Sequence, residues 1–353
     1  MNYEGTTLKQ IGKAHRLIPV LKLGLSSYRP GSSCIIKDIP LIVGIVFTLS
    51  PGMFFPSVES RVAGPTCDPL GWFPESFGVK DHSIFYYSGF YYVVANHIPG
   101  EKYFSYARSK DLCEWEELIP VLANRITDKW DQRGIWSPYV LEDGGLYYLY
   151  FTGVSEDFTQ SIMLASSNDP SDPESWEVHS MIFQPDHPGM LWEEGVWADC
   201  RDPMVIRVGQ VYHLYYTGAD ESGGIVGMAT SNSPTGPWTD WGGIIEPLPG
   251  SAMPESPVLT MYNGRYYLFY NDTTQGEVVS IGGSQAGPWN RPRCFSPGWA
   301  HELWRDTTGS WMTSYLTDYS ITISPLVWDE FFSPPQPFIG TEVYHQLLPA
   351  VQK

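Results

Sequence analysis

Short runs of apolar and aromatic residues recur along the chain, and they predict β-strands throughout. In each of five segments an apolar strand precedes a glycine-containing turn, and an aromatic residue follows ten positions after the segment start. This pattern is typical of a β-hairpin. The segments are DHSIFYYSGFYYVV from Asp81, SPYVLEDGGLYYLYF from Ser137, DPMVIRVGQVYHLYY from Asp202, SPVLTMYNGRYYLFY from Ser256 and HELWRDTTGSWMTSY from His301.

The hairpins belong to larger repeats. Four of the five continue into a third strand with small polar residues and close on a tryptophan (Trp115, Trp176, Trp238 and Trp289). Propeller blades repeat every ~40–50 residues, and the spacing here is slightly longer, with the excess in loops. Radial repetition also protects sheet edges that an open sheet of this many strands would expose. The sequence therefore predicts an all-β fold, a five-bladed β-propeller with a non-propeller N-terminal segment.

The first sixty residues differ from the repeats. Between Met1 and Lys37 basic residues face a single acid, Glu4, and an apolar run follows from Ile39 to Leu49. The run is shorter than the ~20 residues of a membrane helix but fits a signal-peptide core of roughly 7–15 residues. We expect a secreted or extracytoplasmic protein with a signal peptide or N-terminal anchor; the alternative is a buried element of the fold.

These patterns divide the chain into three parts. They are a basic N-terminal segment at 1–60 with its apolar run at 39–49, a propeller catalytic domain at 66–340, and a C-terminal tail at 341–353.

Composition narrows the partners. The net charge of −18 argues against nucleic acid and anionic membrane surfaces as partners, because a protein binds them through basic patches. We therefore expect no contact with a membrane beyond the N-terminal anchor. Aromatic residues make up 15% of the chain and charged residues 17%, a balance that suits an all-β protein with a carbohydrate substrate. The five cysteines show no CxxC spacing, so neither a zinc site nor a redox motif is predicted, and one disulfide is allowed.

Equivalent positions of the innermost strands converge on the axis of a propeller, so the segment starts are the candidate site. The starts are Asp81, Ser137, Asp202, Ser256 and His301, preceded by Lys80, Trp136, Arg201, Glu255 and Ala300. Neighbouring acids in a confined pocket shift one another's pKa, so one carboxyl group can hold a proton while another is ionised. Cleavage of a glycosidic bond needs one protonated and one ionised carboxyl group. We predict catalytic Asp81, Asp202 and Glu255, with His82, Trp136, Arg201 and His301 binding substrate and no metal ligand.

At these residues the chain resembles glycoside hydrolase family 43 and its five-bladed relatives, families 32, 62 and 68, over roughly Cys67 to Ile339. The matching motifs are Asp81-His82 (usually Asp-Pro), Trp136-Ser137-Pro138, Asp202-Pro203, Glu255-Ser256-Pro257 and His301. The resemblance implies an arabinofuranosidase or xylosidase type of hydrolase. Asp81 would be the general base, Asp202 the residue that orients and tunes the acid, and Glu255 the general acid. No cofactor is required, and calcium in the central channel is allowed.

Two other functions stay open. The Arg201-Asp202-Pro203 triplet is similar to the fructan- and sucrose-cleaving family 32, whose members retain configuration through a covalent intermediate on the first Asp, whereas family 43 enzymes invert. Carboxyl separations of ~5–5.5 Å and ~6.5–9.5 Å distinguish the two mechanisms. The absence of the Trp-Met-Asn-Asp-Pro-Asn opening of family 32 favours inversion. The third function is a sugar-binding propeller without catalysis.

Three tryptophans are candidates to stack on sugar faces: Trp72, Trp136 and Trp197. Most propeller tryptophans pack between blades, so Trp136 is the one we predict to contact substrate. The acidic pair Glu193-Glu194 is interpreted as part of a solvated loop.

Overall fold

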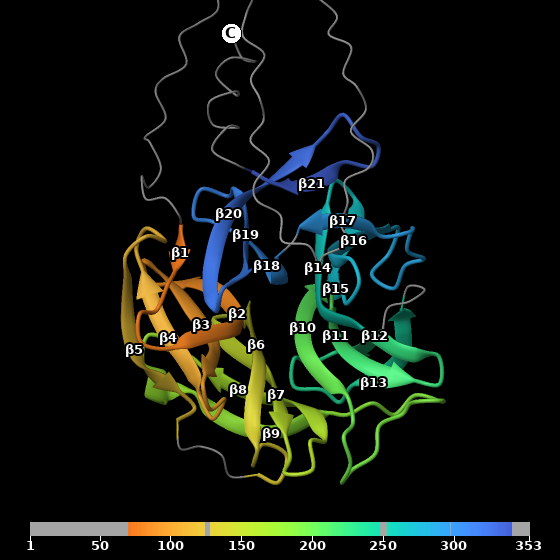
Figure 1. Ribbon diagram of the computed structural model, residues 1–353, viewed down its shortest axis with the longest axis horizontal. Helices are drawn as coiled ribbons and strands as arrows, with labels where there is room; N and C mark the ends of the chain where they lie inside the picture. Colours follow the sequence, from red (N-terminus) through yellow and green to blue (C-terminus); the bar gives the residue numbers. More distant parts are fainter. Residues whose placement is uncertain (1–69, 124–127, 248–252, 297, 341–353) are drawn as a thin grey trace, which may run out of the picture. The chain divides into compact units, whose positions relative to one another are not determined.

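The protein folds into five antiparallel sheets, which confirms the predicted five-bladed propeller (Figure 1). The computed structural model describes residues 70–123, 128–247, 253–296 and 298–340. The predicted apolar run at 39–49 and the tail at 341–353 lie outside the described residues. The innermost strands β2, β6, β10, β14 and β18 surround a common centre (Figure 1).

Each of the first four blades contains four strands in sequence order. Blade one holds β2 (Gly78–Tyr87), β3 (Phe90–Ile98), β4 (Phe104–Ser109) and β5 (Trp115–Val121). Blade two holds β6 (Gly134–Asp143), β7 (Leu146–Val154), β8 (Gln160–Ser167) and β9 (Glu177–Phe183). Blade three holds β10 (Cys200–Val208), β11 (Val211–Asp220), β12 (Gly223–Ser231) and β13 (Thr239–Ile245). Blade four holds β14 (Pro254–Tyr262), β15 (Arg265–Asp272), β16 (Gly276–Gly282) and β17 (Arg293–Ser296).

The fifth blade combines strands from both ends of the propeller. It contains β18 (Trp299–Arg305), β19 (Trp311–Thr317), β20 (Ser320–Asp329), β21 (Gln336–Ile339) and β1 (Gly71–Trp72). Both β1 and β21 pair with β20, where Gly71 lies opposite Thr322. The N-terminal strand therefore joins the last blade and closes the ring, which removes an edge that would otherwise stay unpaired.

Buried tyrosines link each of the first four blades to the blade that follows it. In four places a tyrosine hydroxyl donates a hydrogen bond to a backbone carbonyl in an outer loop of the following blade. The pairs are Tyr106 with Pro170 (2.6 Å), Tyr150 with Pro234 (2.7 Å), Tyr215 with Gln285 (3.0 Å) and Tyr267 with Pro335 (2.8 Å). A buried tyrosine needs such a partner for its hydroxyl group, so these bonds fix the packing angle between blades.

The core between the blades is aromatic. Phe104 and Phe151 of adjacent blades meet edge to face with ring centroids 5.8 Å apart, and Trp176 is only 1% exposed. Among the described residues the helical structure consists of one 3₁₀ turn, η1 (Pro173–Ser175), and none of their helices has the length and apolar character to cross a bilayer.

Candidate active site

Every innermost strand carries a β-bulge at the same place. The residue at the bulge adopts a left-handed backbone conformation in each blade: Asp81 (φ 37°), Ser137 (φ 49°), Asp202 (φ 57°), Ser256 (φ 51°) and Ala300 (φ 50°). Adjacent residues of a regular strand point to opposite faces, and a bulge breaks this alternation. Glu255 can therefore reach the same site as Asp202, although the two residues differ by one position in the repeat.

The fifth blade corrects one detail of the predicted register. Ala300, not His301, occupies the left-handed position equivalent to Asp81. The residue before it, Trp299, pairs with Leu316 just as Glu255 pairs with Asn271 in the fourth blade. His301 is therefore equivalent to the residues that follow the bulge in the other blades.

Side chains of the second strand hold the bulges in place. In four blades an Asn or Thr accepts a hydrogen bond from the backbone N–H of the bulged residue in the next blade. The pairs are Asn96 with Ser137 (2.9 Å), Thr152 with Asp202 (3.1 Å), Thr217 with Ser256 (3.2 Å) and, with its amide group turned to suit its neighbours, Asn271 with Ala300 (3.1 Å). The blade-to-blade contacts thus fix the backbone that carries the candidate catalytic residues.

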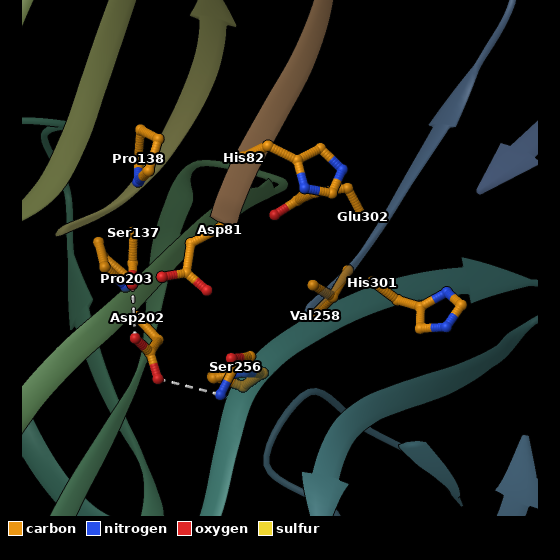
Figure 2. Close-up of a pocket in the computed structure, with 11 residues that line it drawn as sticks. Asp81, His82, Ser137, Pro138, Asp202, Pro203, Ser256, Val258, His301 and Glu302 are labelled. Carbon is orange, nitrogen blue, oxygen red and sulfur yellow. Dashed lines mark hydrogen bonds between the residues drawn. The ribbon is translucent and has the colours of Figure 1, made fainter. Parts of the chain in front are cut away.

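The bulges surround one cavity. It is lined by Asp81, His82, Ser137, Pro138, Asp202, Pro203, Ser256, Pro257, Val258, His301 and Glu302. Figure 2 shows the carboxyl group of Asp81 directed toward Ser137 and Asp202. Two of the three predicted catalytic acids therefore share a cavity, as the repeat register predicts.

Asp202 is held in one orientation by its neighbours. Its Oδ1 accepts a hydrogen bond from Ser137 Oγ at 2.7 Å, and its Oδ2 accepts one from the Ser256 N–H at 3.2 Å (Figure 2). The Oδ2 atom also accepts a hydrogen bond from Thr217 Oγ1 at 2.8 Å. Asp81 in turn accepts a hydrogen bond from Asn96 Nδ2 at 3.2 Å. Asp81 is thus positioned by a side chain of its own blade, and Asp202 by groups of its own blade and of both adjacent blades.

Arg201 connects Asp202 with Glu255. Its guanidinium lies 3.6 Å from Asp202 Oδ2 and donates a hydrogen bond to Glu255 Oε1 at 2.6 Å. It also pairs with Asp199. Burial lowers the pKa of Arg201, but the three surrounding carboxylates raise it overall, so the group stays charged. Glu255 does not line the cavity itself; it joins the site through Arg201.

The environment raises the pKa of two of the predicted acids. Burial, with the negative charge of Asp202 as the second cause, raises the pKa of Asp81 to about 7. Burial also raises the pKa of Glu255, and the opposing effect of Arg201 does not cancel it. Carboxyl groups with raised pKa values in one site are characteristic of acid–base chemistry.

Residues 76–191 match the family model of glycosyl hydrolases family 43. The predicted resemblance to this family is confirmed. The matched range includes Asp81 and Trp136, whereas Asp202 and Glu255 lie beyond it.

Solved structures support the family 43-like fold. A thermostable family 43 glycoside hydrolase is similar with a TM-score of 0.60 and 16% identity, over 78% of the chain and 95% of that structure. Fructan 1-exohydrolase IIa from Cichorium intybus is similar with a TM-score of 0.63 and 16% identity, over 79% of the chain and 61% of that structure.

A curated relative resembles the chain in sequence over a shorter stretch. The 6(G)-fructosyltransferase of Asparagus officinalis is 32% identical over 132 residues, which are 33% of the chain and 20% of the relative. The chain thus spans about a fifth of the length of this relative.

The two predicted substrate-binding histidines line the cavity of the family 43-like propeller but are buried. His82 Nε2 lies 2.7 Å from Ser314 Oγ, and His301 Nδ1 lies 2.9 Å from Thr313 Oγ1. Burial lowers the pKa of each to about 3, so both rings are neutral at physiological pH. The imidazole of His301 points away from the two aspartates (Figure 2). Both residues thus border the cavity as neutral rings, and their contact with substrate stays a prediction.

Trp136 belongs to a polar group beside the cavity. Its indole Nε1 donates a hydrogen bond to Glu101 Oε2 at 2.8 Å, and Glu101 pairs with Lys80 at 2.5 Å. Trp136 also lines a separate surface hollow with Arg133. The indole is half-buried, and its orientation is fixed by this hydrogen bond.

Two residues near the axis were missed by sequence reasoning. Glu302 lines the cavity, and burial together with the charge of Asp81 raises its pKa well above the ordinary value. Trp299 is 42% exposed at the position equivalent to Glu255 and Arg201. The motif at His301 contains Glu302, and placing the bulge one residue earlier would have identified Trp299.

Calcium in the central channel stays a prediction. Calcium takes six to eight oxygen ligands. Within the described ranges no three His, Cys, Asp or Glu side chains are placed together to hold a metal ion. We therefore derive no chemical step through a metal.

Proposed function

We propose that this propeller hydrolyses O-glycosidic bonds of oligo- or polysaccharides with inversion of configuration. The observation that carries the proposal is the link between the three acids: Asp81 shares a cavity with Asp202, and Arg201 joins Asp202 to Glu255. The family 43 match over the first part of the propeller supports an arabinofuranosidase or xylosidase type of activity.

In this mechanism each acid has its own task. Asp81 takes a proton from water as the water oxygen attacks the anomeric carbon, and Glu255 gives its proton to the departing glycosidic oxygen. Asp202 stays in place through its three hydrogen bonds and raises the pKa of Asp81 through its charge. Arg201 orients Glu255 and moderates the rise in its pKa.

A second candidate is a retaining enzyme that acts on fructans or sucrose. The Arg201-Asp202-Pro203 triplet and the fructosyltransferase similarity favour it. Asp81 would then attack the anomeric carbon itself, and water would release the covalent intermediate with Glu255 as the base. NMR of the first-formed product separates the two candidates: an inverted anomer supports the main proposal, and a retained anomer supports the second.

Replacement of Glu255 tests the acid role. We expect Glu255→Gln to lower kcat about 10²–10⁴-fold on natural oligosaccharides, and much less on aryl glycosides with good leaving groups, which depart without a proton. The substrates are a panel of xylo-, arabino- and fructo-oligosaccharides with the matching aryl glycosides. Glu116→Gln is the matched control, because Glu116 is an exposed acid of the outer strand β5 that pairs with Arg108. An equal loss on both substrate types would contradict the assignment of Glu255 as acid. Absence of turnover on the whole panel by the wild type would favour the sugar-binding propeller.

We also propose that the protein is exported. Cys113 and Cys294 each take part in a disulfide, and disulfides persist mainly in oxidising compartments. The basic segment and apolar run at 39–49 are consistent with a secretory signal or anchor. Detection of the protein outside the cytoplasm of its host tests this proposal.

A further inference from the structure

We propose that Trp197, supported by Phe158, forms a distal subsite that binds a sugar unit on the leaving-group side of the cleaved bond. The proposal rests on the hydrolase function proposed above. It makes the preferred substrate a carbohydrate chain of several units rather than a disaccharide.

A chain of contacts places Trp197 next to the proposed acid. Its indole Nε1 donates a hydrogen bond to Asp199 Oδ1 at 3.2 Å, and the same carboxylate pairs with Arg201. Arg201 donates to Glu255 at 2.6 Å. Glu255 gives its proton to the leaving group, so the side of the site beyond Arg201 belongs to the departing sugars. Two side chains separate the indole from Glu255, and the subsite therefore lies further out than the sugar that receives the proton.

The surface at Trp197 suits a sugar ring. Trp197 is 60% exposed, which leaves much of the large indole accessible to solvent. It stacks on Phe158 with ring centroids 5.1 Å apart and an interplanar angle of 23°. The guanidinium of Arg133 lies 3.6 Å from the centre of the Phe158 ring. An aromatic surface flanked by a polar group accommodates both the apolar face and the hydroxyl groups of a sugar.

Hydrogen bonds prevent the Trp197 loop from collapsing. Thr159 Oγ1 donates to the Val196 carbonyl at 2.8 Å and accepts from the Gly195 N–H at 3.0 Å. Beneath the loop, Trp192 is buried and donates to the Gln160 carbonyl at 2.7 Å. The exposed indole is thus presented by a fixed backbone, and binding costs little ordering of the protein.

The strained backbone of Phe158 also supports a ligand-binding role for the stacked pair. Its φ of 65° is left-handed, which is rare for a bulky residue and carries a cost that ligand-binding segments often tolerate. This conformation sets the ring of Phe158 under Trp197. The strain is explained if the stacked pair serves a ligand.

The test compares two exposed tryptophans in the full-length protein. Trp197→Ala is matched by Trp241→Ala, since Trp241 is 63% exposed on β13 and donates its indole N–H to Thr230 at 2.8 Å. KM is measured for the disaccharide and the pentasaccharide of the xylo-, arabino- and inulin-type series. We expect Trp197→Ala to raise KM for the pentasaccharide about five- to twentyfold, with a much smaller effect on the disaccharide, and Trp197→Phe to recover part of the loss.

The outcomes separate this inference from the proposed hydrolase function. If pentasaccharides are hydrolysed but Trp197→Ala and Trp241→Ala give the same KM, the subsite is wrong and the hydrolase stands. If no sugar is hydrolysed, calorimetric titration with the same pentasaccharides decides: weaker binding by Trp197→Ala alone supports the subsite and contradicts the hydrolase. Absence of both turnover and binding contradicts both.

Discussion

At the scale of single residues, the chemistry depends on how burial and charge act on Asp81. The residue lies in a cavity beside a second carboxylate, and both effects favour the protonated form. A base or nucleophile works only when it is ionised, so the environment of Asp81 sets the pH at which the site becomes active.

The raised pKa of Asp81 predicts how activity depends on pH. Because the pKa of Asp81 is raised to about 7, we expect kcat/KM to increase as the pH rises through about 7, where Asp81 loses its proton. Replacement of Asp202 by Asn removes the neighbouring negative charge, so the rise should move to lower pH in the residual activity of that variant. The measurement is kcat/KM from pH 4 to 9 for both proteins. A rise at the same pH in both would show that Asp202 does not tune Asp81.

The sequence could identify these acids because they recur at the same place in the repeat. It could not give their protonation, since that depends on burial and on contacts from other blades, such as the charge of Asp202 in the third blade beside Asp81 in the first. The sequence did not favour Trp197 as a residue that contacts sugar for a related reason. A sequence does not distinguish a tryptophan packed between blades from one that is 60% exposed, as Trp197 is.

At the scale of elements, the bulge of each innermost strand is the feature that makes the site. It depends on the preceding blade, as the hydrogen bond between Thr152 and the Asp202 N–H illustrates. Thr152 is fully buried, so no water can replace it easily.

Replacement of Thr152 by Val tests this dependence. The change keeps the shape of the side chain but leaves the Asp202 N–H without its partner, so we expect the free energy of unfolding to fall by about 1–3 kcal/mol. Activity should fall as well, because Asp202 shifts. Thr152→Ser, which keeps the hydroxyl group, should recover most of both losses. Urea unfolding and kcat on the same preparations are the measurements, and unchanged activity in Thr152→Val would show that the bulge does not position Asp202.

The predicted register placed His301, not Ala300, at the start of the fifth segment, and this error results from the length of a hairpin turn. In the first blade Tyr87 pairs with Phe90 across a tight turn, whereas in the fifth blade Arg305 pairs with Trp311 across the longer turn 306–310. The five segments align without gaps on the aromatic residue after the turn. The longer turn of the fifth blade therefore shifts the apparent start of its segment to His301. Turn length is weakly encoded by residue type, so the sequence predicted the hairpin but not its register.

At the scale of the whole molecule, ring closure gathers residues that are far apart in the chain. The first strand, β1, completes the last blade, and the tyrosine hydroxyl groups link successive blades. The repeat predicted this architecture from sequence because five similar hairpins have few other ways to bury their faces. The strand β1 could not be predicted from the sequence, because its two residues, Gly71 and Trp72, are too few to form a recognisable strand pattern.

The central claim is that Asp81, Asp202 and Glu255 act on one bond. The most direct measurement is a crystal structure of Asp81→Asn with a bound oligosaccharide from the series that the wild type hydrolyses. We predict that one glycosidic bond lies between residue 81 and Glu255, with about 6.5–9.5 Å between the side-chain amide of residue 81 and the Glu255 carboxyl group for the inverting mechanism. A sugar bound away from this cavity, or a Glu255 carboxyl group directed away from the bond, would contradict the account.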